Sequence, residues 1–293
     1  MAQCRFDGQV ALVTGAASGL GRQHAIDLAC RGASVMINDI AYDGGRSRAE
    51  VLAEELRAQG FSVAHDTSNL GDEDSARGAV ARTVATFGRI DILVNNAGNG
   101  IPGAVQDTTT ADFTAVINVH VFGMFWTMSE ALNYMRAQNY GRIINTASAL
   151  GAFGMWGAFS YVTAKSAIFG MTKAAALDNS DKDILVNTLS PTAYTQMGTG
   201  YTSIDPRFTE EKMHVSHVSP VVLLLAHRDC PVNGEAISAC GGRAARIFTA
   251  TVRGYAGDPL TCEGLLENID TVLDSREFFD LKSSREQYDL IPE

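Results

Sequence analysis

The residues best able to do chemistry are Tyr161 and Lys165, which stand four apart in the string S-Y-V-T-A-K. Side chains at this spacing share one face of a helix. A free phenol has a pKa of about 10 and is a poor base at neutral pH. A neighbouring ammonium favours the phenolate, so this pair is suited to moving a proton to or from an alcohol oxygen.

A glycine turn near the N-terminus, T-G-A-A-S-G-L-G, predicts the hydride carrier that such a pair needs. Gly15, Gly19 and Gly21 follow an apolar run at 9–14 and precede a helix expected to end near Arg31. Glycines let the backbone approach a pyrophosphate at a helix N-terminus, where free N–H groups and the helix dipole attract anions. We therefore expect a dinucleotide site here, with Ser18 and Leu20 also contacting the cofactor.

Asp39 ends the second expected strand and predicts which nucleotide binds. A carboxylate at this place accepts hydrogen bonds from the ribose hydroxyls and repels a 2′-phosphate. No arginine stands in A-A-S-G or directly after Asp39 to offset that repulsion. We therefore predict NAD rather than NADP.

Residues after the third and fourth strands complete the expected cofactor site. Asp66 and the adjacent Thr67 are placed to meet the adenine end, and N-N-A-G at 95–98 follows the fourth strand. Ala97 and Gly98 are small enough for close approach of a ligand. Asn95 has two open interpretations, as a ligand-binding residue or as a structural link between strand ends.

The order of elements predicts an α/β fold. Continuous apolar runs separated by helices are typical of a parallel sheet covered on both faces, and right-handed crossovers make it a doubly wound, Rossmann-type sheet. We expect one domain over residues 1–254 and an acidic tail over 255–293. The expected strands lie at 9–14, 33–39, 61–66, 91–95, 142–146 and 185–190.

Composition narrows the class of protein. The net charge of -10 argues against nucleic acid or an anionic membrane as partner, and no run approaches the ~20 apolar residues of a membrane span. The first strand begins too early to leave room for a signal peptide, and five scattered cysteines form no C-x-x-C pair. We expect a cytoplasmic protein with reduced thiols. His214 and His217 have no third ligand nearby, so no metal site is expected.

Together these motifs resemble the classical short-chain dehydrogenase/reductase family. The resemblance covers about residues 8–242 and rests on the glycine turn, Asp66, N-N-A-G, Asn118 in I-N-V, Ser148 and Y-x-x-x-K at 161–165. It implies a Rossmann-type sheet of about seven strands in a homotetramer or homodimer.

The resemblance also implies roles for individual residues. Tyr161 would be the general acid/base, and Ser148 would hold the substrate oxygen. Lys165 would bind the nicotinamide ribose and lower the pKa of the tyrosine. Asn118 would hold a water in a proton relay behind the lysine.

One segment departs from the family pattern. The family has P-G-x-V-x-T after the sixth strand, with the threonine near the carboxamide, and this chain has P-T-A-Y-T-Q-M. Pro191 is retained, and either Thr195 or Gln196 would meet the nicotinamide. The following segments resemble the dehydrogenase domain of multifunctional 3-hydroxyacyl-CoA enzymes and related bacterial dehydrogenases of hydroxysteroids and other secondary alcohols.

The substrate side is indicated by the run G-A-F-G-M-W-G-A-F at 151–159, just before the tyrosine. It is either plain core or the lining of an apolar substrate site, and we favour the lining. The segment 198–216 is either a cover over the cleft or a passive loop. The expected substrate contacts are Ser148, Phe153, Met155, Trp156, Tyr161, Met197 and Tyr201.

These observations predict an NAD-dependent oxidoreductase that interconverts a bulky apolar secondary alcohol and its ketone. The alcohol would be a hydroxysteroid, an aryl alcohol or a 3-hydroxyacyl-CoA, and the last would favour a basic patch. The alternative is a non-catalytic NAD(H) sensor or scaffold on the same fold. An apolar helix at 116–135 would serve subunit contact, and the candidate basic residues are Arg207, Lys212, Arg243 and Arg246.

Overall fold

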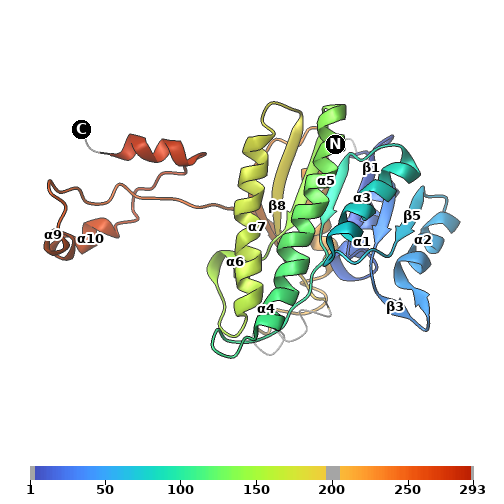
Figure 1. The fold of residues 1–293 in the computed structure, drawn as a ribbon, viewed down its shortest axis with the longest axis horizontal. Helices are drawn as coiled ribbons and strands as arrows, with labels where there is room; N and C mark the ends of the chain where they lie inside the picture. The colour runs from blue at the N-terminus through green and yellow to red at the C-terminus, as the bar shows by residue number, and fades with distance from the viewer. Residues whose placement is uncertain (1–3, 196–204, 292–293) are drawn as a thin grey trace. The chain divides into compact units, whose positions relative to one another are not determined.

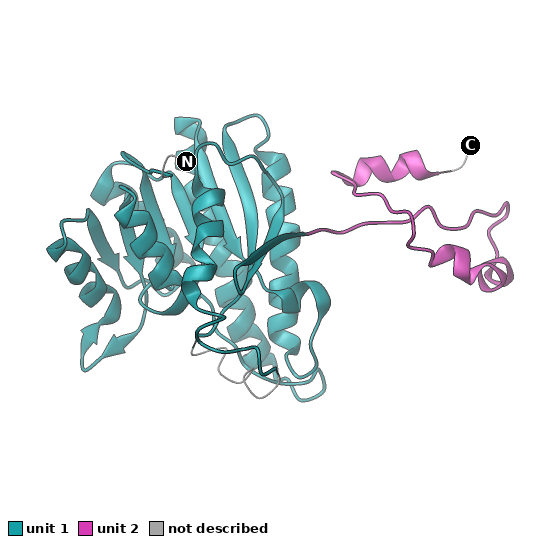
Figure 2. Cartoon of the chain, turned by 180° about the vertical axis from the view of Figure 1, so that it is seen from behind, with its two compact units in different colours: residues 1–246 teal, residues 247–293 magenta. Residues whose placement is uncertain are grey.

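The computed structural model describes residues 4–195 and 205–291. The chain divides into two compact units, residues 1–246 and 247–293 (Figure 2). The division falls at Arg246, a few residues before the boundary expected at 254.

An eight-stranded sheet forms the centre of the first unit, in the order β10-β9-β8-β7-β6-β1-β2-β5 (Figure 1). Neighbouring strands from β9 to β5 are parallel in every pair. This confirms the doubly wound sheet, with one strand more than the seven expected. The strands are β1 Val10–Thr14, β2 Ser34–Asn38, β5 Val63–Asp66, β6 Ile92–Asn95, β7 Gly141–Thr146, β8 Ile184–Thr192, β9 Ala236–Cys240 and β10 Arg243–Ile247.

Helices bury an apolar cluster on each face of the sheet. One cluster joins α1 (Gly19–Cys30) and α8 (Ser219–Ala226) to the strands. The other joins α3 (Glu73–Phe87) and α5 (Gly123–Gln138), which lie in front of the sheet in Figure 1. The packed core on each face of the sheet therefore fixes the positions of the polar residues at the strand ends.

The apolar segment 116–135 is helical throughout, as expected, but it includes a π-helical turn that was not predicted. It contains the end of α4 (Thr110–Ile117), a π-helical turn at Asn118–Phe122, and most of α5. Apolar spacing does not distinguish an i→i+4 turn from an i→i+5 turn. Such turns occur mostly as single bulges and often mark functional sites.

A small hairpin precedes the second helix. Strands β3 (Tyr42–Asp43) and β4 (Arg46–Ser47) pair antiparallel, and α2 follows at Arg48–Ala58. The Ser47 side chain caps α2 by accepting a hydrogen bond from the Glu50 amide. Helix α2 begins only at Arg48, because the residues just before it form this hairpin.

The second unit contains short helices, α9 (Cys262–Glu267), α10 (Ile269–Val272) and a 3-10 helix at Ser284–Leu290. Helices α9 and α10 are separated at Asn268. None of these helices buries a residue. Over the described parts of both units, no helix has the length and apolarity needed to cross a membrane.

Candidate active site

Tyr161 and Lys165 lie in α7 (Phe159–Asp178), and the helix brings their side chains together. The Lys165 Nζ lies 5.4 Å from the centre of the Tyr161 ring and donates a 2.6 Å hydrogen bond to the Thr146 carbonyl oxygen. Lys165 is only 2% exposed. Burial lowers the pKa of its ammonium to about 7. Lys165 thus occupies a water-poor site at the carboxyl end of β7, and Tyr161 beside it is half-buried.

Ser148 follows β7 and begins the short helix α6 (Ala149–Phe153). Its buried hydroxyl accepts a 3.2 Å hydrogen bond from the Leu150 amide. The cap uses an oxygen lone pair, so the hydroxyl hydrogen stays available as a donor. A Cβ at Gly151 would lie 2.6 Å from the Lys165 carbonyl carbon, so α6 packs directly on α7 beside the lysine.

The π-helical turn brings His120 to Tyr161. The two rings meet edge to face, with their centres 5.4 Å apart and their planes at 88°. His120 is 1% exposed. Burial, and then the charge of Lys165, lower the pKa of its imidazole to about 3, so it is neutral at ordinary pH.

Asn118 is the first residue of the same turn and is half-buried. Among the described residues its side chain makes no hydrogen bond. His120 was not predicted to be a site residue. A histidine two residues after Asn118 was the available signal, but its direction depends on the π-helical turn.

Asn96 clamps the glycine turn to the loop after β6. Its Nδ2 donates hydrogen bonds to the carbonyl oxygens of Thr14 (2.9 Å) and Gly15 (3.1 Å). A Cβ at Gly21 would lie 2.2 Å from the Gly15 oxygen and 2.5 Å from the Asn96 Nδ2. Glycine at 21 is thus required by the clamp. Our sequence analysis did not single out Asn96, although it lies within N-N-A-G.

The neighbours of Asn96 are held by similarly close packing. A Cβ at Gly15 would lie 2.8 Å from the Ala97 Cα, and a Cβ at Gly98 would lie 2.3 Å from the His120 ring. Asn95 donates a 3.0 Å hydrogen bond to Asn145 and accepts one of 2.8 Å from Thr127. The Asn95 side chain therefore links two strands to α5, as the structural interpretation requires.

The N-terminus of α1 is open to an anion. Ser18 stands at the N-cap but makes no capping bond through its side chain, and the first turn contains no acidic residue. Thr195, after β8, comes back to this turn: its Cγ2 lies 3.4 Å from the position of a Cβ at Gly19. The site thus has unpaired N–H groups on one side and a threonine on the other.

Other expected contacts in this region have different surroundings. Leu20 is half-buried against the apolar core, and Pro191 pairs with Ala239 in the sheet. Gln196, Met197 and Tyr201 lie outside the described residues.

Asp39 is half-exposed and faces the glycine turn. Its carboxylate accepts 2.9 Å hydrogen bonds from the amides of Ala17 and Ala41. Each oxygen retains a lone pair for a ribose hydroxyl. The residue is thereby fixed at the edge of the expected cofactor site.

Asp66 is buried and bonded on both oxygens. Oδ1 accepts from Asn38 (2.7 Å) and from the Ser68 amide (2.9 Å), and Oδ2 pairs with Arg82 at 2.6 Å. Burial would raise the pKa of this carboxyl, but hydrogen bonds from Ser68, Arg82 and Asn38 outweigh it and lower the pKa below its usual value. Thr67 beside it is exposed.

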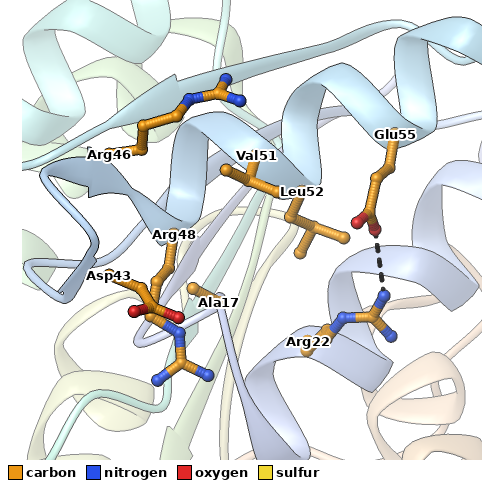
Figure 3. A pocket seen from close by; sticks show the side chains of 8 residues that line it. All are labelled: Ala17, Arg22, Asp43, Arg46, Arg48, Val51, Leu52 and Glu55. Atoms are coloured by element: carbon orange, nitrogen blue, oxygen red, sulfur yellow. Dashed lines mark hydrogen bonds and ion pairs between the residues drawn. The ribbon is translucent and has the colours of Figure 1, made fainter.

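A pocket of about 260 Å³ lies between α1 and α2, next to Ala17 (Figure 3). Three of its lining residues are arginines. Arg22 pairs with Glu55 at 3.2 Å, and Arg46 pairs with Glu54 at 2.7 Å. Arg48 makes no ion pair with any residue that the structure describes. Our sequence analysis missed this cluster because it considered only residues adjacent to Asp39.

The aromatic run before Tyr161 is not core. Phe153 and Trp156 are exposed, and Met155 is half-buried. The strand-like contact of Gly103 with Ala158, with a 2.9 Å bond from the Gly103 amide to the Gly157 oxygen, ties this run to the loop after β6. It therefore lies beside the entry to α7, where an apolar substrate contact stays a prediction.

The candidate basic residues fall into two pairs. Arg207 and Arg246 are already bonded to Asp205 and Glu235, each at 2.6 Å. Lys212 and Arg243 are exposed and have no ion pair in the described part of the chain. The Lys212 backbone approaches the turn before Arg243, since its carbonyl oxygen lies 3.5 Å from the position of a Cβ at Gly241. Within the described ranges, no cluster of His, Cys, Asp and Glu is suited to a metal ion.

Comparison with known proteins agrees with this geometry. The family model for short chain dehydrogenase matches residues 9–203. The chain belongs to the short chain dehydrogenase family. It is accordingly a nicotinamide-dependent oxidoreductase that acts on CH–OH groups or the corresponding ketones.

Three relatives show how much of the chain is shared. It is 35% identical over 269 residues to the peroxisomal multifunctional enzyme type 2 of Drosophila melanogaster, covering 88% of this chain and 44% of that protein. With the enzyme of the same name from Mus musculus it is 34% identical, covering 92% and 37%. With the (2S)-[(R)-hydroxy(phenyl)methyl]succinyl-CoA dehydrogenase subunit BbsD of Thauera aromatica it is 36% identical, covering 81% and 97%. The chain spans less than half the length of the two multifunctional enzymes.

Solved structures give the same fold. A short chain dehydrogenase from Mycobacterium avium has a TM-score of 0.81 at 31% identity, covering 92% of this chain and 97% of that one. The full-length Drosophila melanogaster multifunctional enzyme has a TM-score of 0.79 at 29% identity, covering 97% and 49%.

Proposed function

We propose that this dehydrogenase uses NAD(H) to interconvert a bulky, apolar secondary alcohol and its ketone, with Tyr161 as general acid/base. The observation that carries the proposal is the buried Lys165 ammonium 5.4 Å from the centre of the half-buried Tyr161 ring. A buried ammonium next to a phenol favours the phenolate at a pH where a free phenol keeps its proton.

The residues of the site fit a nicotinamide nucleotide. The free N–H groups of α1 suit a pyrophosphate, and the remaining lone pairs of Asp39 suit a ribose. Lys165 uses one of its three donors on Thr146, whose buried hydroxyl oxygen has no partner in the described structure. Polar atoms left without partners in a buried site are expected where a ligand supplies them. When bound, the nucleotide supplies the hydride acceptor or donor.

The protein's own residues handle the proton. In the oxidation direction, the Tyr161 phenolate accepts the proton of the substrate hydroxyl while the C–H hydrogen leaves as hydride. Ser148 would hold the substrate oxygen with its hydroxyl hydrogen, and Lys165 stabilises the phenolate by its charge. In the reverse direction Tyr161 returns the proton to the carbonyl oxygen.

The proposed preference for NAD rests on Asp39. Its carboxylate is fixed by Ala17 and Ala41, so it is unable to turn away from a 2′-phosphate. The arginine pocket favours the opposite choice, but the charges of Arg22 and Arg46 are balanced by glutamates. Arg48 alone remains to attract a phosphate. We therefore expect strong NAD use with measurable NADP use.

The proposed substrate is apolar and, in one of its candidate forms, carries coenzyme A. The exposed aromatic side chains at 153 and 156 support an apolar contact. Lys212 and Arg243 support a phosphate-bearing tail, because both are exposed cations without ion pairs in the described chain. The Thauera relative is named for a CoA thioester, whereas the name of the Drosophila relative gives no substrate. Hydroxysteroids and aryl alcohols therefore belong in the same test.

A homotetramer or homodimer is likewise part of the proposal. Phe122 and Phe125 at the start of α5 are 45% and 47% exposed. Adjacent exposed aromatic residues are typical of subunit contacts. The cytoplasmic location stays a prediction, and the names of two relatives place those proteins in peroxisomes.

The decisive experiment is turnover by Tyr161→Phe. A panel of hydroxysteroids, aryl alcohols and 3-hydroxyacyl-CoA esters is assayed with NAD+ and NADP+ by the absorbance of the reduced nucleotide. We expect a ~10²–10⁴-fold loss of kcat with unchanged nucleotide affinity by calorimetry. Wild-type turnover in this variant would contradict the catalytic assignment. A sensor or scaffold, by contrast, would bind nucleotide and turn over none of the panel in either form.

A further inference from the structure

His120 is the buried residue that joins the main parts of the active site. It lies in the middle of the π-helical turn, where the wider turn carries its ring to Tyr161. Its Nε2 is 2.7 Å from the Asn99 carbonyl oxygen, in the loop after β6. The ring also lies under Gly98, where no Cβ would fit.

We propose that His120 is the positioning residue that holds the Tyr161 ring and shields Lys165 from water. The inference rests on the proposed function, because it assigns a role to the Tyr161–Lys165 pair. It places the support for the acid/base residue in the π-helical turn between α4 and α5, and it leaves the role expected for Asn118 as it stands.

Two contacts with Asn99 bear on the tautomer of the ring: Nε2 lies 2.7 Å from the Asn99 carbonyl oxygen and 3.1 Å from the Asn99 amide nitrogen. We assign the hydrogen to Nε2 on the shorter contact, which needs a donor on the ring, and Nδ1 is then the bare acceptor. The Nδ1 atom is buried and has no partner in the described structure. The titratable groups that act on the ring, Tyr161 and Lys165, both come from α7.

A neutral ring suits this place for two reasons. It adds no positive charge beside the buried ammonium of Lys165, and its volume excludes water from that ammonium. Replacing it with a smaller side chain would admit water and screen the lysine charge. The phenolate would then be less stabilised, and the pKa of Tyr161 would rise.

The test is a tyrosinate titration by ultraviolet difference absorbance in the absence of nucleotide. The Tyr161 signal is isolated by subtracting the same titration of the matching Tyr161→Phe background. In His120→Ala we expect the pKa of Tyr161 to rise by about one unit or more, and kcat to fall about 10-fold or more while KM changes less. In His120→Asn, whose amide is still able to donate to Asn99, we expect part of both effects to be restored.

His24 provides a matched control. It is also a fully buried histidine with a pKa lowered by burial to about 3, but it lies in α1 and contacts Ser219 at 3.1 Å. His24→Ala should lower folding stability without moving the tyrosinate titration. If His120→Ala does not fold, His120→Asn alone decides the question.

Two outcomes would overturn the inference. One is an unchanged tyrosinate titration in both His120 variants. The other is a shift in Asn118→Ala that the His120 variants lack. Full turnover by Tyr161→Phe would instead refute the proposed function, and the titration would still show whether His120 controls the phenol.

Discussion

The two ends of the proposed cofactor site are built in opposite ways. At the catalytic end, Lys165 and His120 are 2% and 1% exposed, and burial lowers the pKa of each. At the adenosine end, the three arginines of the pocket are exposed, and two of them pair with glutamates. Burial makes each group at the first end costly to alter, whereas solvent screens the charges at the second. We therefore expect packing to fix the chemistry of the site, and a few surface charges to govern the choice of nucleotide.

The largest expected effect tests the buried end. Lys165→Met keeps the volume of the side chain and removes its charge, so we expect kcat to fall by ~10²–10⁴-fold. The same variant should be more stable than the wild type, because burial of the charged ammonium lowers the free energy of unfolding of the wild type. Steady-state kinetics and thermal unfolding of the two proteins measure the two effects.

The stability gain of Lys165→Met should depend on pH. The pKa of Lys165 is lowered from its unfolded value of 10.5 to about 7, so the folded state binds fewer protons between these values. Wild-type stability therefore rises with pH across that window, and the gain is largest below pH 7 and disappears toward pH 10.5. A gain that is constant with pH would mean that Lys165 is not the charged, buried group described here.

The next effect tests the clamp between the two ends. Gly21→Ala places a Cβ 2.2 Å from the Gly15 oxygen, so the turn or Asn96 must move. Overpacking of this kind costs about 1–3 kcal/mol, and we expect nucleotide affinity to fall ~10–100-fold by calorimetry. Gly170→Ala is the matched control, since a Cβ there meets nothing within 4 Å. That substitution should stabilise α7 and leave affinity unchanged; equal losses in both variants would refute the role of the clamp.

A smaller effect tests the exposed end. Asp39→Asn keeps the shape of the side chain and removes the charge that would repel a 2′-phosphate. We expect the preference for NAD+ over NADP+, measured as the ratio of dissociation constants, to fall about 10-fold. A ratio that stays the same would show that Asp39 does not select the nucleotide.

Sequence and structure agree where a local pattern determines the geometry. The Y-x-x-x-K spacing is sufficient to bring Tyr161 and Lys165 together on a helix, and the glycine turn requires glycine at 21. The position of His120 was not predictable in this way, because apolar spacing does not reveal the π-helical turn. Arg48 was missed because the hairpin at residues 42–47 brings it back toward Ala17. Both depend on how the backbone turns between elements, which side-chain periodicity does not record.

The smallest expected effect separates Arg48 from its neighbours. Arg48 has no ion pair in the described chain, whereas Arg22 has Glu55 within 3.2 Å. Arg48→Ala should therefore weaken NADP+ binding by roughly 1.5- to 5-fold, the range for a single exposed charge pair, and leave NAD+ binding unchanged. The double variant Arg22→Ala/Glu55→Ala, the matched control, should change it less, because it removes a pair whose charges balance. Both differences should shrink as salt rises. A loss of NADP+ affinity in Arg48→Ala that does not depend on salt would indicate a change in the packing of α2. The exposed end of the proposed cofactor site would then depend on packing, as the buried end does.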